Sequence, residues 1–419
     1  MENLLFVNAP SDGSVKGTVA LPSSKSISNR VLIIKALCEK DFVIENLSEA
    51  EDTKTLIRAL KLVGISPDID AGHTGTAMRF LVSYLATRPG TFYLTGSERM
   101  KERPIAALVN ALQQLGADIT YQGKTGYPPL KIKGKKLRGG KISVQAGTSS
   151  QFISSLLLIA PELDEGLEIT LEGTAVSTSY IKMTLGLLAK FGIETRWERN
   201  VIAVSPGKYQ PANISIEPDW SGASYFYELL LLSEKGELFF PGLQNKSLQG
   251  DEIVWQWFEH LGVKTSFSAK GALAEKTGHL PEFVSFGFGE NPDLAQTLAM
   301  AFAGSGIQAI FRGLETLPLK ETDRIKALQG ELDKLGYSLA PREEGIWQLR
   351  KTAWPLIPGL ITFYTYNDHR MAMACAPLAI KLGQVAIIDP EVVSKSFPGY
   401  WDNLMQLGFK LVYGIKEPE

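Results

Sequence analysis

A short charged segment in the second half of the chain carries the most specific chemistry. Residues 320–324, Lys-Glu-Thr-Asp-Arg, place four charged side chains and a hydroxyl in five consecutive positions. On a helix, Lys320 and Arg324 would lie on the same side and Glu321 would lie near Arg324. Such a cluster can bind an anion, but it can equally form a self-neutralising patch on a solvated surface.

Other cations precede or open stretches with helical spacing. Ser26 and Arg30, four residues apart, would share one face of a helix that serines cap, although a capped surface helix has the same pattern. Gly75 allows close backbone approach before another helix, Arg103 precedes a proline at an expected first helical position, and Arg370 falls in the opening turn of an apolar helix. If these cations converge, they form a pocket for one or two small, multiply anionic ligands. The eight cations of this kind are Lys25, Arg30, Arg79, Arg103, Lys320, Arg324, Arg370 and Lys395.

Polar side chains that could complete such a pocket occupy similar positions. Asp293 follows a glycine-rich stretch and precedes an apolar helix, where it is either a partner of the helix dipole or a base that faces a cleft. Residues 149–151, Ser-Ser-Gln, suit a polyol or a phosphate ester, and Ser177 and Tyr180 follow an expected strand at 167–171. Each of these segments also passes as ordinary loop or capping chemistry.

The elements that must position these residues recur along the chain. Six helical stretches end in an apolar residue and a glycine, which stops a helix because it accepts the left-handed conformation. The glycines are Gly64, Gly116, Gly192, Gly262, Gly336 and Gly408. The first interval is 52 residues and the others are 70 to 76, which favours six copies of a helix–glycine–strand module over a coincidence of common helix ends. We therefore predict two domains of three modules each.

Composition excludes several classes of protein. The 419 residues have a formal net charge of −2, which argues against a general nucleic-acid or membrane-surface protein. No apolar run reaches the length of a membrane span and the N-terminus lacks the pattern of a secretory signal, so we expect a soluble cytoplasmic protein. Cys38 and Cys375 are expected to be buried without a disulfide, and the four histidines have no spacing that would hold a metal.

The ordered motifs resemble the 5-enolpyruvylshikimate-3-phosphate synthase family of enolpyruvyl transferases. The resemblance spans about residues 10–405, and its most specific parts are Lys-Glu-Thr-Asp-Arg at 320–324 and Asp-His-Arg-Met-Ala-Met at 368–373. It implies an α/β fold of two similar domains, each with three βαβαββ units about a pseudo-threefold axis (an inside-out barrel), and an active site in the interdomain cleft. The N-terminal strand would join the C-terminal domain, which implies domains at 23–217 and at 1–22 plus 218–419, with the two crossover segments as a hinge.

By this resemblance, the protein moves the enolpyruvyl group of phosphoenolpyruvate to the 5-hydroxyl of shikimate 3-phosphate through a tetrahedral intermediate and releases phosphate, a step of chorismate and aromatic amino acid biosynthesis. The family pattern implies that shikimate 3-phosphate is bound by Lys25, Ser26, Arg30, Ser149, Ser150, Gln151, Ser177, Tyr180, Asp293 and Lys320. It implies that phosphoenolpyruvate is bound by Lys25, Gly75, Arg103, Gln151, Arg324, Arg370 and Lys395.

The same resemblance implies the catalytic roles. Asp293 would take the hydroxyl proton, and either Lys25 or Glu321 would protonate the methylene carbon. Domain closure would exclude water. No cofactor and no metal are expected, the partners are the two small substrates without nucleic acid or membrane, and a monomer is expected.

Three positions depart from the family pattern. His73 stands where the family usually has Asn, Ser23 where it has Gly, and Thr316 where an Asn contacts the shikimate phosphate. These departures leave the affinity for phosphoenolpyruvate and the sensitivity to glyphosate open. They touch none of Lys25, Asp293, Glu321 and Arg324.

Three other functions remain as alternatives. A UDP-N-acetylglucosamine enolpyruvyl transferase would have Lys-Asn where this chain has Lys25 and Ser26, and it would carry a reactive loop cysteine. A non-catalytic binder of phosphorylated metabolites would need the cations but not Asp293 or Glu321. An RNA-end-processing enzyme would be more basic and would offer a histidine for nucleotide attachment.

Overall fold

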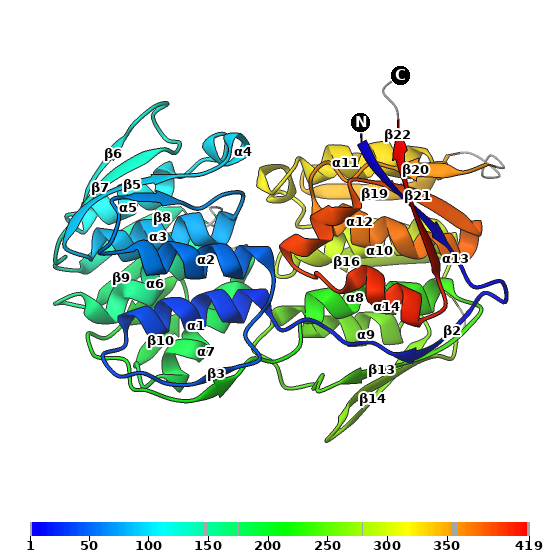
Figure 1. The fold of residues 1–419 in the computed structure, drawn as a ribbon, viewed down its shortest axis with the longest axis horizontal. Coiled ribbons are helices and arrows are strands. Elements are labelled where there is room, and N and C mark those ends of the chain that lie inside the picture. Colours follow the sequence, from blue (N-terminus) through cyan, green and yellow to red (C-terminus); the bar gives the residue numbers. More distant parts are fainter. Residues whose placement is uncertain are drawn as a thin grey trace. The chain divides into compact units, whose positions relative to one another are not determined.

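In a computed structural model the chain divides into two compact units, which are described one at a time (Figure 1). The structure describes residues 2–145, 147, 149–173, 176–278, 280–352 and 359–416. Unit 1 comprises Met1–Pro22 and Glu217–Glu419, and unit 2 comprises Ser23–Ile216. The division falls one residue before the expected one, because Glu217 belongs to unit 1, where Ser247 donates a hydrogen bond to its carboxylate.

Unit 1 contains three four-stranded sheets with one common pattern. In each sheet a parallel pair of strands is followed by two antiparallel neighbours. In pairing order the sheets are β2 (Ser14–Thr18), β13 (Lys235–Pro241), β15 (Gly271–Lys276) and β14 (Val263–Ser268); β16 (Phe283–Gly287), β17 (Gln308–Arg312), β19 (Ile346–Lys351) and β18 (Tyr337–Glu343); and β20 (Ile361–Phe363), β21 (Gln384–Ile388), β1 (Glu2–Asn8) and β22 (Lys410–Lys416).

The helices of unit 1 alternate with these strands. They are α8 (Trp220–Leu232), α9 (Val254–Glu259), α10 (Ala295–Ser305), α11 (Arg324–Asp333), α12 (His369–Cys375), α13 (Ala379–Leu382) and α14 (Tyr400–Gln406), with 3₁₀ turns η2 (Gly250–Ile253), η3 (Pro292–Leu294), η4 (Leu317–Leu319), η5 (Ala376–Leu378) and η6 (Pro390–Lys395). The strand–helix–strand–helix–hairpin order confirms three βαβαββ modules in this unit. Two segments from the N-terminus, β1 and β2, complete modules whose other strands come from the second half of the chain.

Apolar helices form the interior of unit 1. Helices α8, α10 and α12 are buried on nearly all sides, which agrees with their almost continuously apolar sequences. Helix α10 packs against both α8 and α12. Gly304 permits its close approach to α8 and η5, since an added Cβ would lie 2.6 Å from side-chain atoms of both Leu232 and Leu378. In Figure 1 the longer helices run side by side through the middle of the unit, and most strands lie toward its periphery.

Unit 2 contains two complete modules and one that lacks its hairpin. Its four-stranded sheets are β4 (Asp68–Asp70), β5 (Gly90–Thr95), β7 (Leu130–Gly134) and β6 (Asp118–Tyr121); and β8 (Gly140–Gln145), β9 (Leu167–Glu172), β11 (Val201–Val204) and β10 (Thr195–Glu198); a third sheet has only β12 (Ile214–Ser215) and β3 (Ile44–Glu45). The helices are α1 (Lys25–Leu37), α2 (Glu51–Leu62), α3 (Gly75–Ala86), α4 (Glu98–Lys101), α5 (Ala106–Gln114), α6 (Ser150–Ile159) and α7 (Thr178–Lys190), with the 3₁₀ turn η1 (Ala160–Glu162).

The repeated glycines have the predicted conformation. Each of the six has a positive φ, between 70° and 93°, and each follows a helix. The short first interval has a structural reason, because Gly64 leads from α2 directly into β4. Four of the other glycines lead into the first strand of a hairpin, and Gly408 leads into β22, which pairs with β1. The expected strand at 167–171 corresponds to β9.

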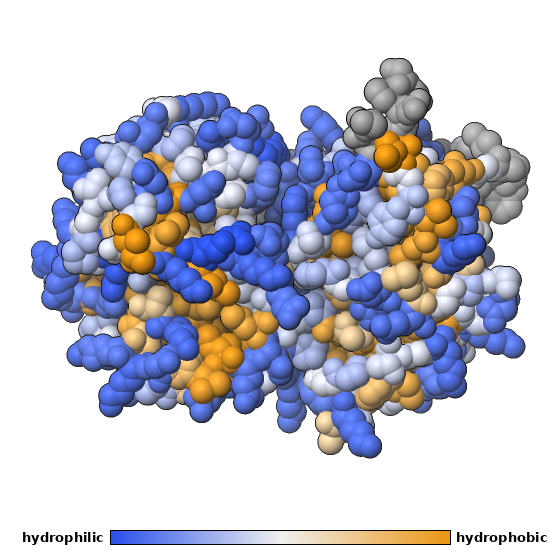
Figure 2. Space-filling model, in the orientation of Figure 1, coloured by the Kyte–Doolittle hydropathy of each residue, from blue (hydrophilic) through white to orange (hydrophobic). Residues whose placement is uncertain are grey.

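Each unit has its own apolar core, and the face shown in Figure 2 is covered mainly by hydrophilic residues with smaller apolar patches between them. Cys375 is buried in α12, as predicted, whereas Cys38, which follows the last turn of α1, is only half-buried; both are free thiols. None of the helices in the described part of the chain is long and apolar enough to span a bilayer.

Candidate active site

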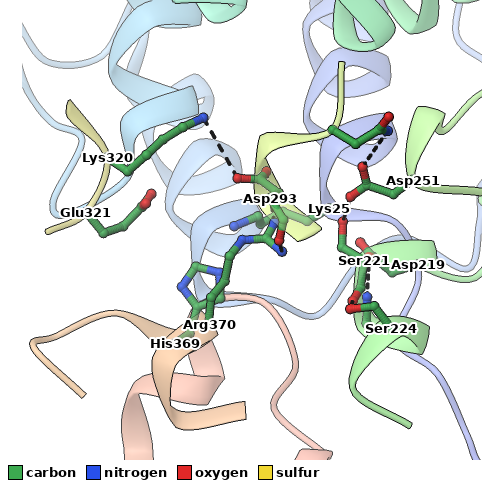
Figure 3. Close-up of polar contacts among 12 residues, drawn as sticks. Lys25, Asp219, Ser221, Ser224, Asp251, Asp293, Lys320, Glu321, His369 and Arg370 are labelled. Carbon is green, nitrogen blue, oxygen red and sulfur yellow. Dashed lines mark hydrogen bonds and ion pairs between the residues drawn. The ribbon is translucent and has the colours of Figure 1, made fainter. Parts of the chain in front are cut away.

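A buried arginine organises a cluster of charged residues in unit 1. Four members of this cluster, Asp293, Lys320, Glu321 and Arg370, are labelled in Figure 3. Arg324, the first residue of α11, is 1% exposed. Its Nε lies 2.7 Å from Asp368 Oδ2, its Nη1 2.8 Å from Asp293 Oδ1 and its Nη2 2.8 Å from Glu321 Oε2. Burial alone would lower the pKa of Arg324, but the three carboxylates, Asp368 foremost, outweigh it and raise the pKa above its ordinary value.

Asp293 contacts three cations. Besides Arg324, its Oδ2 lies 3.0 Å from Arg370 Nη2, and its Oδ1 lies 3.8 Å from Lys320 Nζ. Arg370 also donates from Nη1 to the backbone carbonyl of Asp293 (3.1 Å) and to Tyr225 Oη (3.4 Å). The two oxygens of the carboxylate therefore face different guanidinium groups, which fixes its orientation.

Lys320 lies in a turn next to this cluster and not on the helix that carries Arg324. The expectation that Lys320 and Arg324 share a helix face is wrong, because α11 begins at Arg324 and Asp323 caps it by accepting from the backbone N–H of Lys326. Lys320 lies in the turn after η4. Burial lowers the pKa of Lys320, and the neighbouring charge of Asp293 opposes that shift.

Two acidic residues of unit 1 that the sequence analysis did not single out hold the cluster in place. Asp368 binds Arg324 and, as the N-cap of α12, accepts a hydrogen bond of 2.9 Å from the backbone N–H of Arg370. Asp251 accepts from Asn291 Nδ2 at 3.0 Å and from the hydroxyl of Ser221, and Asn291 immediately precedes η3, which contains Asp293. Burial, reinforced by the charge of Asp293, raises the pKa of Asp251.

Asp368 lay within a motif that was interpreted only for its arginine. No local sequence pattern indicated Asp251, because its role depends on residues 30 and 40 positions away.

The C-terminal cation Lys395 ends η6, and its Nζ donates to the carbonyl of Asn367 at 2.6 Å. The carbonyl of Asn367 lies directly before Asp368, so Lys395 is joined to the same turn as the arginine cluster.

In unit 2, Lys25 begins α1 and is paired with a carboxylate. Its Nζ lies 2.9 Å from Asp52 Oδ2, and Asp52 Oδ1 accepts from Thr74 Oγ1 at 3.2 Å. Asp52, in the first turn of α2, was not predicted as part of the site, because paired acids at a helix start are typical partners of the helix dipole. Ser24 occupies the N-cap position of α1, but its hydroxyl is buried and, among the described residues, has no hydrogen-bond partner, so the predicted side-chain cap is wrong.

Arg30 is buried inside unit 2. It donates to Thr184 Oγ1 (2.7 Å), to Ser154 Oγ (3.0 Å) and to the backbone carbonyls of Ser26 and Tyr180 (2.9 and 3.3 Å). The guanidinium thus links α1, α6 and α7. Burial lowers the pKa of Arg30 to about 10, so the side chain remains charged at neutral pH.

The guanidinium of Arg103 lies directly against Gly75. A Cβ added to Gly75 would lie 2.8 Å from Arg103 Nη1 and 3.0 Å from Nη2. Helix α3 begins at Gly75, as expected, but Pro104 is not a first helical position, because α5 begins at Ala106. Gln151 donates to Thr76 Oγ1 at 3.3 Å, which joins the starts of α6 and α3.

The remaining predicted residues lie at helix starts of unit 2. Ser149 caps α6 by accepting from the backbone N–H of Gln151, as predicted, and Ser150 is the first helical residue. Ser177 occupies the N-cap position of α7 with a left-handed φ of 54° and makes no side-chain capping hydrogen bond there, and Tyr180 lies in the first turn of that helix. Helices α1, α3 and α6, which pack on one another, thus begin at Lys25, Gly75 and Ser150, and helix starts attract anions.

The three departures from the family pattern have different surroundings. His73 is exposed just before α3, and Ser23 is half-buried before α1. Thr316 precedes η4, and its buried hydroxyl has no hydrogen-bond partner within the described part of the chain. Nowhere among the described residues do three His, Cys, Asp or Glu side chains gather into a set that could hold a metal ion.

Comparison with known proteins identifies the class. A model of the EPSP synthase family (3-phosphoshikimate 1-carboxyvinyltransferase) matches residues 10–71 and 66–404. A 3-phosphoshikimate 1-carboxyvinyltransferase of Bacteroides fragilis is 44% identical over 412 residues, which cover 98% of this chain and 99% of the relative. The enzyme of the same name from Cellvibrio japonicus is 36% identical over 430 residues, with 96% of this chain and 99% of the relative covered.

The fold agrees with this relationship. A solved structure of EPSP synthase from Acinetobacter baumannii superposes with a TM-score of 0.78 at 23% identity, and the match covers 98% of this chain and all of that one. The chain belongs to the EPSP synthase family. This confirms the resemblance drawn from the motifs and the expectation of an enolpyruvyl transferase.

Proposed function

We propose that this protein transfers the enolpyruvyl group of phosphoenolpyruvate to the 5-hydroxyl of shikimate 3-phosphate. The membership in the EPSP synthase family carries the proposal, and the carboxylate–cation cluster around Arg324 is the geometry that supports it. Asp293 accepts the proton of the attacking hydroxyl while an acid protonates the methylene carbon of phosphoenolpyruvate, which forms the tetrahedral intermediate. Phosphate then leaves as a proton is lost from the methyl group, and the enolpyruvyl double bond forms again.

The charges of unit 1 constrain how an anionic substrate binds. Lys320, Arg324 and Arg370 face Asp293, Glu321 and Asp368, so this cluster of six side chains is close to neutral. An additional carboxylate or phosphate therefore needs further positive charge. In this proposal Lys395 supplies it in unit 1, and Lys25 and Arg103 supply it from unit 2.

The acid that protonates the carbon is either Lys25 or Glu321. Both are held close to a partner of opposite charge, Lys25 by Asp52 and Glu321 by Arg324. Lys25→Met and Glu321→Gln separate the two roles. The variant that abolishes exchange of the methylene hydrogens with solvent deuterium identifies the acid, since only proton addition to carbon makes those hydrogens exchangeable.

Phosphate release tests the proposed reaction directly. The protein with both substrates should release phosphate, whereas neither substrate alone should be consumed. Asp293→Asn, which retains shape and loses the base, should lower kcat by about 10²–10⁴-fold. The matched control is Asp402→Asn, an exposed position on α14. Binding of both substrates without any phosphate release by the unaltered protein would favour the non-catalytic binder.

We also propose that the protein acts as a monomer in the cytoplasm. Both substrates of the proposed reaction are phosphorylated, and such anions do not cross a bilayer unaided, which supports a site on the same side as the enzymes that make them. Analytical ultracentrifugation at several protein concentrations tests the assembly state. A monomer sediments as a species of 45.9 kDa at each concentration, whereas a concentration-dependent increase contradicts the proposal.

A further inference from the structure

The turn before α12 has a strained backbone. Tyr366 and Asn367, two consecutive residues other than glycine, have φ values of 53° and 57°. Side chains with a Cβ disfavour this left-handed region, and tyrosine, which is bulky, does so more than asparagine. The turn is closed by the backbone N–H of Asp368, which donates to the carbonyl of Thr365 at 2.8 Å. A turn of this kind persists only where its surroundings hold it.

A buried carboxylate on α11 provides that hold. Tyr366 Oη donates to Glu331 Oε1 at 2.6 Å, and the side chain of Glu331 has no exposed surface. Its other oxygen accepts from Lys334 Nζ at 2.6 Å and from the backbone N–H of Tyr364 at 3.3 Å. Glu331 therefore joins α11 to the segment before the turn and to the turn itself.

The neighbours of this contact leave it little freedom. Lys334 Nζ also donates to the carbonyl of Thr362 at 2.9 Å and lies 4.7 Å from the centre of the Tyr364 ring. A Cβ added to Gly330 would lie 3.0 Å from Tyr366 Oη, so the hydroxyl rests against the backbone of α11. Burial and the adjacent Glu331 carboxylate raise the pKa of Tyr366, which keeps the hydroxyl protonated as a donor.

The turn directs three cations of the candidate active site. The carbonyl of Asn367 accepts from Lys395 Nζ, and the carboxylate of Asp368 binds Arg324 and the backbone N–H of Arg370. A change in the backbone at 366 and 367 therefore moves the acceptors that hold the Lys395 ammonium, the Arg324 guanidinium and the start of α12, which carries Arg370.

We propose that Tyr366 and Glu331 are positioning residues, which hold the left-handed turn so that Lys395, Arg324 and Arg370 are directed at the same anionic substrate. Neither side chain needs to touch a substrate in this role. The kinetic consequence rests on the proposed function, in which these cations bind phosphoenolpyruvate.

Tyr366→Phe removes the hydroxyl and keeps the ring. We expect KM for phosphoenolpyruvate to rise about tenfold, equivalent to about 1.4 kcal/mol, while KM for shikimate 3-phosphate stays within about twofold. The matched control is Tyr227→Phe, which also loses a buried hydrogen bond in unit 1, between Tyr227 Oη and Thr265 Oγ1. The control should lower Tm without separating the two KM values. Equal changes in both KM values for Tyr366→Phe, or no change in either, overturn the proposal.

A second substitution tests the strain itself. Glycine accepts a positive φ without a Cβ penalty, so Asn367→Gly in the Tyr366→Phe background should recover at least half of the lost affinity for phosphoenolpyruvate, on a logarithmic scale. Glu331→Gln keeps an acceptor for Tyr366 and should impair phosphoenolpyruvate binding less than Glu331→Ala does. If Asn367→Gly recovers no affinity and Glu331→Gln impairs binding as much as Glu331→Ala does, the turn is not held in this way.

A measurement without turnover separates this proposal from the proposed function. Hydrogen–deuterium exchange of peptides that cover residues 364–370 should be faster in Tyr366→Phe than in the unaltered protein, and unchanged in Tyr227→Phe. Unchanged exchange in Tyr366→Phe overturns the positioning role even if the protein is an active transferase. Faster exchange in a protein that releases no phosphate leaves the turn correctly assigned and removes the proposed function instead.

Discussion

At the scale of single residues, the close contact between Gly75 and Arg103 makes a sharp prediction. The methyl group of Gly75→Ala would overlap the guanidinium of Arg103, the far end of a flexible side chain that can move aside. We expect KM for phosphoenolpyruvate to rise by about tenfold or more, equivalent to about 1.4 kcal/mol, with little change in Tm. Gly287→Ala, which has open space around the added methyl group, is the control for steady-state kinetics and thermal unfolding. An unchanged KM would mean that Arg103 does not contact this substrate.

The residue scale also shows what the sequence could and could not predict. The motifs identified Asp293, Arg324 and Arg370 correctly as neighbours, because each begins or precedes a helix of the same unit. They gave no reason to expect that the donors of Arg30 would be occupied by Thr184 and Ser154, since these partners lie 154 and 124 positions away. Long-range partners of this kind depend on how modules pack, which no local pattern encodes.

At the scale of elements, the interior helix α8 carries an unusual carboxyl group. Glu228 has no exposed surface, and neither of its oxygens has a hydrogen-bond partner among the described residues. Burial raises the pKa of Glu228 well above its ordinary value, so the native state keeps the proton that the unfolded chain releases above a pKa of about 4.3. Because the native state then binds more protons, the free energy of unfolding falls as the pH rises from about 4.3 toward the native pKa.

Replacing this side chain should therefore stabilise the protein in a pH-dependent manner. Glu228→Leu should raise Tm at pH 8 and should raise it less at pH 5. Within this window, the gain in the free energy of unfolding should shrink by about 1.4 kcal/mol for each unit by which the pH is lowered. The exposed Glu259→Leu on α9 is the control, and thermal unfolding at the two pH values is the measurement. An advantage of equal size at both values would show that packing, and not the proton, causes the effect.

The approach of α10 to its neighbours gives a second prediction for an element. Gly304→Ala places a methyl group 2.6 Å from side-chain atoms of Leu232 and Leu378, at a site where the core is already closely packed. We expect a loss of about 1–3 kcal/mol in the free energy of unfolding, measured by urea denaturation. Gly289→Ala, with no atom within 4 Å of the added group, should change stability much less.

The order of elements was more predictable than their exact ends. The glycine repeat predicted the alternation of helices and hairpins, because a helix stop is a local property of the backbone. It did not predict that the first module of unit 2 lacks a hairpin, although the shorter interval between Gly64 and Gly116 was visible. The start of α11 was missed because Asp323, and not a residue before Lys320, provides the cap.

At the scale of the whole molecule, the two units differ in how the chain builds them. Unit 2 is one continuous segment with its own apolar core, whereas unit 1 needs Met1–Pro22 in addition to Glu217–Glu419. Strand β1 is an inner strand of its sheet, between β21 and β22, and β2 forms the parallel edge of another. The chain leaves unit 1 after Pro22 and returns to it at Glu217. The two segments of unit 1 are in contact near these points, since the backbone N–H of Asp219 donates to the carbonyl of Pro22 at 2.8 Å.

This difference predicts unequal behaviour of fragments. A fragment of residues 23–216 should fold alone and unfold cooperatively in urea. A fragment of residues 217–419 should not, because β1 is the one strand that pairs with β22 in the described part of the chain, and this fragment lacks it. Addition of a peptide of residues 1–22 should restore part of its structure, as followed by near-ultraviolet circular dichroism. Cooperative unfolding of the 217–419 fragment by itself would contradict this view of β1.

The pairing of the first strand with the last has one more consequence. Because Glu2 is opposite Lys416 in the ladder between β1 and β22, a few added residues could link the two ends of the polypeptide. If the linked ring were then opened between Pro22 and Ser23, each unit would be encoded by one uninterrupted stretch, and a single peptide connection, at residues 216 and 217, would remain between them. Such a circular permutant would keep every strand neighbour of the natural protein, and one chain connection instead of two would join unit 1 to unit 2.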